Sequence, residues 1–452
     1  MRIPPTPPDS ATIFAQLLKQ NDEKAFRVLG EIGPVDNKNR YLHWEKIRHL
    51  TPPDDFSHEE WWAGTKMARR NLYKPIPLKA KNGKNFQYSL PDCVLKELHW
   101  IDQNASGSLQ TDSPITNPHS RDSYLLRSLI DEAINSSQLE GASTTRNVAK
   151  EMLRENRPPK DRSEQMIYNN FLAMEFIREI KNEKLTPEMV LELHRVLTKN
   201  TLDKPEMAGK YREKDDAIHV VDRDEIEVLH VPPPSGELEE RMKNLCAFGN
   251  SSNDEFFLHP ILRAIILHFQ LAYDHPFVDG NGRTARALFY WYVAKQKYWL
   301  MEYISISGII KKSPAKYGRA YLYTETDDGD LTYFMIYQLE VIRKAIAELY
   351  AYLKRKAAEI REVEQLISAT KTLKGKLNYR QLEVIKHALK HPGAVYKIQG
   401  HQKIHGVTYQ TARSDLLDLS DSLHLLQKEK YGKAFIFISP GNLQERIRKK
   451  RI

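Results

Sequence analysis

The chain of 452 residues has only two cysteines, Cys93 and Cys246. This number excludes a framework of several disulfides and fits the reducing cytosol, so we expect both to be packing residues. A long apolar run is also missing. The most apolar stretch, 256–273, is interrupted by histidines, a proline and an arginine, which excludes a membrane-spanning helix. The first ten residues are proline-rich and lack the basic and apolar regions of a signal peptide. We therefore expect a soluble, cytoplasmic protein.

Acidic residues are scarce in the last quarter of the chain. Residues 341–452 hold 23 Lys and Arg but only 10 Asp and Glu, whereas the preceding residues hold 45 against 49. The net charge of +9 therefore belongs to this quarter. Such asymmetry suggests a basic appendage that contacts nucleic acid or an acidic partner. The length predicts about three domains, or one large domain with appendages.

One stretch of the sequence, 275–286, concentrates groups that suit a phosphate ligand. It reads His-Pro-Phe-Val-Asp-Gly-Asn-Gly-Arg-Thr-Ala-Arg. Gly280 and Gly282 allow a tight turn and let backbone N–H groups approach a ligand closely. A helical apolar pattern follows over about 284–294, so these N–H groups should lie at a helix N-terminus, which binds anions.

The charged side chains of this stretch fit the same kind of ligand. Arg283 and Arg286 project from one face of the first helical turn, where the helix dipole disfavours cations, so the ligand should be strongly anionic. Asp279 is a hard oxygen ligand suited to Mg²⁺, and His275 is a base that titrates near neutral pH. The alternative is a glycine-rich loop flanked by surface charges. It explains a lone Gly-x-Gly better than this combination.

The stretch resembles the signature of the Fic family, H-x-F-x-[DE]-G-N-G-R-x-x-R, at every fixed position. The resemblance extends over about residues 39–350. It implies a helical fold that binds ATP and transfers AMP to a Tyr, Thr or Ser hydroxyl of a protein. It further implies these roles: His275 as the base, Asp279 as the ligand of Mg²⁺, the N–H groups around Gly280 to Gly282 with the Asn281 side chain at the α- and β-phosphates, Arg283 at the β-phosphate and Arg286 at the γ-phosphate.

Upstream, residues 136–141 read Ser-Ser-Gln-Leu-Glu-Gly. Alone, this is an ordinary helix end: Ser136 and Glu140 share a helix face, and Gly141 supplies a stop. Beside the Fic signature it resembles the inhibitory motif of the family, [ST]-x-x-x-E-[GN], placed N-terminal to the core. The resemblance implies that Glu140 pairs with Arg286 and excludes the γ-phosphate by competition and like-charge repulsion.

Two further segments resemble parts of the family's site. The pattern over 217–231 predicts a β-hairpin with a turn at 222–224. Its first strand resembles the flap that holds the target by main-chain pairing, through Ile218, His219, Val220 and Val221. Such pairing carries little side-chain selectivity, so it does not identify the target. A helix that opens at Pro314 carries Tyr317, which by position resembles a residue near the nucleotide pocket, although simple packing explains it equally well.

The last part of the chain shows another pattern. Residues 379–390 and 398–405 predict helices, Thr408 caps a third helix to about 421, and 423–428 and 434–438 predict strands. This order resembles a winged helix domain, whose recognition helix would begin with Tyr409. Its basic charge suits DNA phosphates. The same fold also mediates protein contacts, so both uses stay open.

The sequence thus predicts a mainly α protein with four parts. These are an N-terminal helical segment (1–115), a Fic-type helical core with a small β-hairpin flap (116–345), a helical linker (346–375) and a winged helix-turn-helix domain (376–452). The expected function is an autoinhibited protein adenylyltransferase that uses ATP and Mg²⁺ on an unknown protein or on itself. Two alternatives remain: a DNA-binding regulator that senses a nucleotide, or a Fic enzyme that removes AMP or uses another nucleotide donor.

Overall fold

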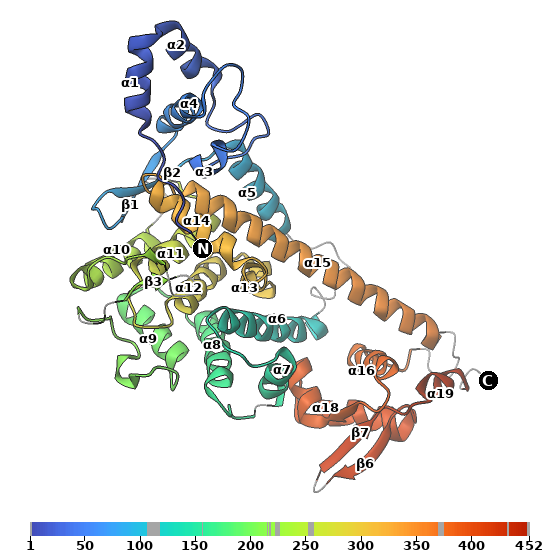
Figure 1. Ribbon diagram of the computed structural model, residues 1–452. Coiled ribbons are helices and arrows are strands. Elements are labelled where there is room, and N and C mark those ends of the chain that lie inside the picture. The colour runs from blue at the N-terminus through green and yellow to red at the C-terminus, as the bar shows by residue number, and fades with distance from the viewer. Residues whose placement is uncertain are drawn as a thin grey trace.

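The structure is a computed structural model that describes residues 2–105, 118–155, 157–214, 216, 218–221, 227–251, 257–368, 375–431 and 434–449. Helices dominate these residues, and the strands form three small antiparallel sheets. The N-terminal helices gather at one end, the helical core lies in the middle, and the C-terminal part lies at the other end (Figure 1). Across the described ranges, no helix combines the length and apolarity that crossing a membrane requires.

The first 105 residues pack into two different cores. Four helices bury their apolar faces in a small core of their own: α1 (Ser10–Gln20), α2 (Asp22–Glu31), α3 (Trp44–Ile47) and α4 (His58–Arg70). Ser57 and Glu60 form a capping box at the start of α4. The hairpin of β1 (Lys74–Lys79) and β2 (Asn85–Tyr88), with α5 (Asp92–Ala105), packs instead into the main core. The chain therefore leaves the small N-terminal core and joins the main core near residue 74.

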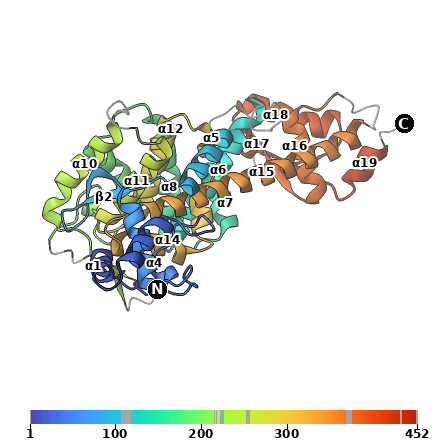
Figure 2. The same ribbon diagram turned by 90° about the horizontal axis from the view of Figure 1, so that it is seen from above.

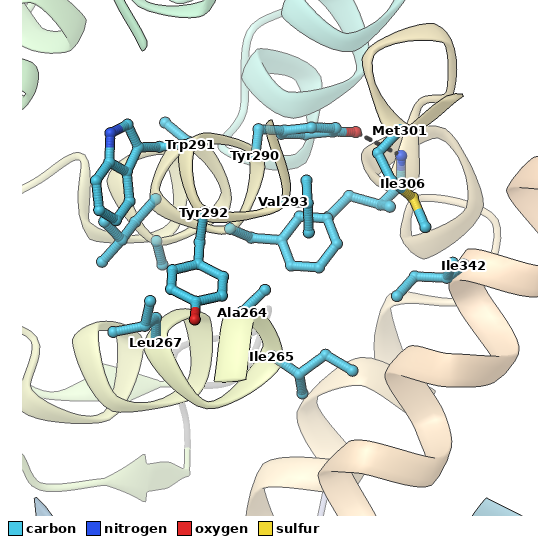
Figure 3. Close-up of a cluster of buried hydrophobic side chains, with 14 of the residues drawn as sticks. Ala264, Ile265, Leu267, Tyr290, Trp291, Tyr292, Val293, Met301, Ile306 and Ile342 are labelled. Atoms are coloured by element: carbon cyan, nitrogen blue, oxygen red, sulfur yellow. Dashed lines mark hydrogen bonds between the residues drawn. The ribbon is translucent and has the colours of Figure 1, made fainter. Parts of the chain in front are cut away.

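The main core is built on α11 (Pro260–Asp274) and α12 (Asn281–Lys295). Both helices are buried along nearly their whole length, as expected for helices that are apolar on all faces. In Figure 3, Tyr292 points from α12 toward Leu267 and Ala264 of α11. Ile306 N donates a hydrogen bond to the Tyr290 hydroxyl at 2.9 Å. The loop 275–280 joins these two helices, so its geometry rests on the most rigid part of the fold.

The remaining core helices surround this pair. They are α6 (Pro118–Leu139), α7 (Arg146–Glu155), α8 (Arg162–Glu179), α9 (Pro187–Thr198), α10 (Leu238–Asn250), α13 (Ile306–Ile310), α14 (Pro314–Thr326) and α15 (Thr332–Ser368). Short 3₁₀ turns lie at η1 (Pro205–Met207), η2 (Ser235–Glu237) and η3 (Trp299–Tyr303). Helix α15 stays in the main core as far as Leu353, so the first part of the expected linker belongs to the core. Figure 2 shows α15 continuing beyond the core toward the C-terminal part.

The predicted hairpin is present but short. Strands β3 (Val220–Val221) and β4 (Val228–His230) pair antiparallel, with Val220 opposite His230. The predicted turn at 222–224 lies outside the described residues. The hairpin is anchored to α11 because His230 Nε2 bonds to Tyr273 O at 2.7 Å.

The C-terminal part has its own apolar core. Its elements are α16 (Tyr379–Lys390), β5 (Val395–Lys397), α17 (Ile398–His405), α18 (Tyr409–Leu417), a π-helical turn η4 (Asp418–Ser422), β6 (Gln427–Tyr431), β7 (Ala434–Ile438) and α19 (Leu443–Lys449). The sheet order is β5-β7-β6. The strand expected over 423–428 begins only at Gln427, because Leu425 and Leu426 turn back to bond with Leu419 O and are buried.

Candidate active site

His275 ends α11 in a left-handed conformation, with φ 46°. Its Nδ1 lies 3.3 Å from Ala272 O. If Nδ1 carries the proton and donates there, Nε2 holds the lone pair that can accept a proton. Burial lowers the pKa of His275 from 6.5 to about 4. The imidazole is therefore neutral at physiological pH and competent as a base.

Arg212 holds the backbone that carries this histidine. Its Nε donates to His275 O at 2.8 Å, and its backbone N donates to Pro276 O at 2.9 Å. Its Nη2 donates to Pro233 O at 2.5 Å, which ties the segment after the hairpin to the same point. Arg212 lies 63 positions before His275 and outside any motif, so no local pattern indicates this role.

Asn281 closes the loop between α11 and α12. Its Oδ1 accepts from Phe277 N at 2.9 Å, and its Nδ2 donates to Phe277 O at 2.8 Å. The side chain is buried, and both ends of its amide are already bonded. The amide therefore fixes the shape of the loop, and the contact of the Asn281 side chain with the α-phosphate stays a prediction.

His194 of α9 supports the other side of the loop. Its Nδ1 accepts from Gly209 N at 2.9 Å, so its Nε2 carries the proton and donates to Asp279 O at 2.9 Å. Burial lowers the pKa of His194 to about 4, which keeps this arrangement neutral. Gly280 has φ +83°, and a Cβ there would lie 2.7 Å from Thr198 Cγ2. Both conformation and space therefore require glycine at this position.

Arg283 is buried at the start of α12 and is only loosely paired. Its Nη1 donates to Leu197 O at 3.1 Å, and its Nη2 lies 3.5 Å from Asp279 Oδ2. Its Nε has no hydrogen-bond partner in the described part of the chain. Burial lowers the pKa of Arg283, which reflects the cost of a guanidinium that is only loosely paired. An anionic ligand at the N-terminus of α12 would relieve this cost.

Asp279 is the candidate metal ligand. Its side chain is 44% exposed, and its Oδ1 accepts from Gly280 N at 2.5 Å. The described residues contain no cluster of three or more His, Cys, Asp and Glu that could hold a metal ion. A single carboxylate completed by phosphate oxygens is typical of Mg²⁺. The donor set therefore fits Mg²⁺ that arrives with a nucleotide.

Arg286 contacts the C-terminal end of α6. Its Nη2 donates to Glu140 Oε1 at 2.7 Å and to Ser136 O at 3.1 Å, while its Nε donates to Ser136 Oγ at 2.9 Å. Burial is the largest single influence and opposes the charge on Arg286, but Glu140, Tyr317 and Glu132 together outweigh it and raise the pKa of Arg286. Gly141 follows with φ 93° and ends the helix. The fold thus brings together the two side chains that the resemblance pairs.

Tyr317 and the hairpin lie around these groups. The Tyr317 hydroxyl bonds to His268 Nε2 at 2.8 Å and to the Tyr321 hydroxyl at 3.1 Å. Burial raises the pKa of Tyr317, and the nearby Arg286 guanidinium partly offsets the rise. Tyr317 therefore belongs to an aromatic cluster beside Arg286. In the hairpin, Ile218 and Val220 are half-buried whereas His219 and Val221 are exposed.

Comparison with known proteins matches residues 184–293 to the Fic/DOC family. The chain is 40% identical to Protein adenylyltransferase Fic of Nematostella vectensis over 110 residues, which are 24% of this chain and 22% of that protein. It is 37% identical to the protein of the same name from Drosophila virilis over 120 residues, 26% of this chain and 22% of that protein. The chain thus spans less than a quarter of the length of these relatives.

A solved structure of a Fic family protein from Desulfovibrio desulfuricans G20 is also similar. It has a TM-score of 0.48 and 18% sequence identity over 77% of this chain and 95% of that chain. A structure of Fic-1, residues 134–508, from C. elegans has the same TM-score with 17% identity over 75% of this chain and 86% of that chain.

Proposed function

With residues 184–293 as a Fic/DOC domain, we propose that the protein transfers AMP from ATP to a hydroxyl of a protein. The observation that carries the proposal is the placement of a neutral, buried His275 at one end of the loop and a loosely paired Arg283 at the other. A base and an anion site on one rigid loop suit phosphoryl-group chemistry. The names of the relatives over this part of the chain support the same reaction.

ATP would bind across the N-terminus of α12. The N–H groups around Gly280 to Gly282 take the α- and β-phosphates, and Arg283 takes the β-phosphate through the guanidinium that the protein leaves loosely paired. Arg286 takes the γ-phosphate once Glu140 releases it. Asp279 would hold Mg²⁺, which neutralises charge on the phosphates when it is bound.

The reaction is a displacement at the α-phosphorus. His275 Nε2 removes the proton from a Tyr, Thr or Ser hydroxyl, and the hydroxyl oxygen forms the new bond to the α-phosphorus. The bond between the α-phosphorus and the oxygen that bridges to the β-phosphate breaks, and pyrophosphate leaves. The exposed Val221 and Val228 of the hairpin suit a target segment that adds as a strand and presents its hydroxyl.

Glu140 would restrain this reaction. Its carboxylate pairs with the Arg286 guanidinium at 2.7 Å. The γ-phosphate therefore cannot pair with Arg286, and the Glu140 carboxylate repels it. ATP then settles with its α-phosphate away from the attacking hydroxyl, and a small misplacement can lower the rate by ~10²-fold.

The proposal is tested with ATP labelled on the α-phosphate or on the γ-phosphate. The full-length Glu140→Gly protein is incubated with each in the presence of Mg²⁺ and a cell lysate. AMP transfer predicts label on protein only from the α-labelled nucleotide. Label from γ-labelled ATP would indicate a kinase, and label from neither would favour a site that senses nucleotide or uses another donor. Loss of label from a pre-modified protein would identify removal of AMP.

We further propose that residues 376–452 form a winged helix domain that binds DNA. Tyr409, Gln410 and Ser414 at the start of α18 are exposed, as are Lys428 and Lys430 on β6, which suits a helix end that enters a groove and a strand that contacts phosphates. Duplex binding should weaken steeply with rising salt. Lys428→Gln with Lys430→Gln should reduce that slope, and absence of salt-sensitive binding to any duplex would leave a protein-contact module.

A further inference from the structure

A cavity outside the candidate active site is lined by none of residues 275–286. Its volume is about 630 Å³, and it is lined by residues of α6, the first residue of α7, the segment around α13 and the middle of α15. This volume lies in the range of small-molecule sites. None of the roles assigned above uses this cavity.

The lining of this cavity is basic and aromatic. It contains two carboxylates, Asp131 and Glu348, against five cations, which are Arg127, Arg146, Lys311, Lys312 and Arg355. Asp131 pairs with Arg146 at 2.8 Å, and Glu348 pairs with Lys312. The two carboxylates thus leave an excess of positive charge in a concave site.

The Tyr352 ring lies against two of these cations. The Arg127 guanidinium lies 3.6 Å from the centre of the Tyr352 ring, and that of Arg355 lies 5.5 Å from it. Stacking on an aromatic face holds a guanidinium in place, and Arg127 Nε also lies 3.6 Å from Asp131 Oδ2. Tyr124 and Tyr303 also line the cavity.

We infer that this cavity binds a phosphate-bearing small molecule. Excess positive charge calls for an anion, and forked guanidinium donors match phosphate oxygens. The tyrosine rings suit a nucleoside attached to the phosphate, whereas the cations alone suit an inorganic polyphosphate. The ligand is therefore either a nucleotide or an inorganic polyphosphate.

Hydrogen bonds connect the cavity to the turn that carries Glu140. Lys311 Nζ donates to Gln138 Oε1 at 2.5 Å, and Gln138 Nε2 donates to Thr144 O at 2.8 Å. These two bonds span the turn from the end of α6 to the segment before α7. A phosphate in the cavity competes with Gln138 for Lys311.

The second connection runs through Asp131. Its carboxylate on α6 pairs with Arg146 at 2.8 Å and with Lys150 at 3.3 Å, both on α7. A phosphate that draws Arg146 into the cavity weakens the tie between these two helices. Ligand binding should therefore loosen the turn around Glu140 and release Arg286. This regulatory part rests on the proposed transfer of AMP, whereas the binding site itself does not.

Binding is tested on the full-length protein by calorimetry with inorganic tripolyphosphate, ATP and adenosine as probes. Arg283→Gln weakens binding at the candidate active site in every sample, and Mg²⁺ is left out. In that background, Arg127→Gln with Arg355→Gln should weaken tripolyphosphate binding by roughly tenfold or more, about 1.4 kcal/mol for each factor of ten.

A matched pair controls for lost charge. Arg195→Gln with Lys243→Gln removes two exposed cations from α9 and α10 and should leave tripolyphosphate binding unchanged. Tighter binding of ATP than of tripolyphosphate supports a nucleotide site, and equal binding supports a polyphosphate site. Melting temperatures verify that each variant is folded. If a folded cavity variant binds tripolyphosphate as well as the matched pair does, the site does not exist.

The regulatory connection is tested without added ligand. Lys311→Ala removes the bond to Gln138 and should raise AMP transfer several-fold, whereas Lys316→Ala, an exposed lysine on α14, should not. Glu140→Gly serves as the reference for full release. Transfer by Glu140→Gly with no rise in Lys311→Ala would overturn the connection alone. No transfer by Glu140→Gly would overturn the proposed function and leave the binding result intact.

Discussion

The Glu140 carboxylate fills the space directly beside Gly282. A Cβ on Gly282 would overlap Glu140 Oε1 and would lie 3.0 Å from Arg286 Nη1. Gly282 therefore serves the contact between α6 and the loop as well as the close approach of a ligand. The motif glycine and the upstream glutamate, far apart in the sequence, share one packing contact.

Gly282→Ala should destabilise the wild-type protein more than the Glu140→Gly protein. In the wild type the new methyl group overlaps a carboxylate that Arg286 holds in place, and such overpacking costs about 1–3 kcal/mol. With glycine at 140 the space is open. Chemical denaturation of the two single variants and the double variant measures this difference. Equal destabilisation in both backgrounds would contradict the contact.

Asn281→Ala should lower the free energy of unfolding by about 1–3 kcal/mol, because it leaves the buried N–H and C=O of Phe277 without their partner. Thermal and urea denaturation check this. Asn37→Ala, at an exposed position in the N-terminal part, is the control and should change stability little. A loss of ATP affinity with unchanged stability would contradict this structural role and identify Asn281 as a phosphate ligand.

Arg212→Lys should lower kcat with little effect on the KM for ATP. Lysine keeps the charge but cannot reach His275 O and Pro233 O with a planar fork, so His275 shifts while the phosphate site stays. A displacement of the base can cost ~10²-fold in rate. Steady-state kinetics in the Glu140→Gly background measure both constants. A rise in KM without a fall in kcat would refute a positioning role.

The pH dependence of transfer should report the buried histidine. With the pKa of His275 lowered to about 4, the neutral base is fully present above that pH and is lost as the pH falls through it. For the Glu140→Gly protein, the acid limb of kcat/KM should therefore lie near pH 4 and not near 6.5. Circular dichroism at each pH shows that the protein is folded. An acid limb near 6.5 would mean that His275 is hydrated.

Helix starts were predictable because capping is local. Thr408 was predicted to cap a helix, and its side chain accepts a hydrogen bond from Thr411 N at the first turn of α18. Asp9 and Asn21 cap α1 and α2 in the same way.

The strands and the support of the loop were harder to predict because they depend on distant partners. Strand β5 has only three residues and exists through its pairing with β7. His194 lies 85 positions from Asp279 and Arg212 lies 63 positions from His275. A motif identifies the reacting groups, but residues that merely hold backbone carbonyls leave no local pattern.

The Fic signature names the groups of the loop, and the fold holds them in different ways. The Asn281 amide bonds to Phe277 N and Phe277 O and so shapes the loop. Arg283 and Arg286 have the same side chain, yet one is loosely paired and the other is held by Glu140. The difference between the two arginines comes from their neighbours in the fold and not from the motif.

The most direct measurement compares AMP transfer by the wild type, Glu140→Gly and Glu140→Gly with Arg286→Ala, using α-labelled ATP. Glu179→Gly, which changes a glutamate at the end of α8, is the matched control. The account predicts that Glu140→Gly transfers markedly more AMP than the wild type, that Arg286→Ala removes the gain, and that Glu179→Gly behaves as the wild type. If Glu140→Gly is no more active than the wild type, Glu140 does not restrain the reaction.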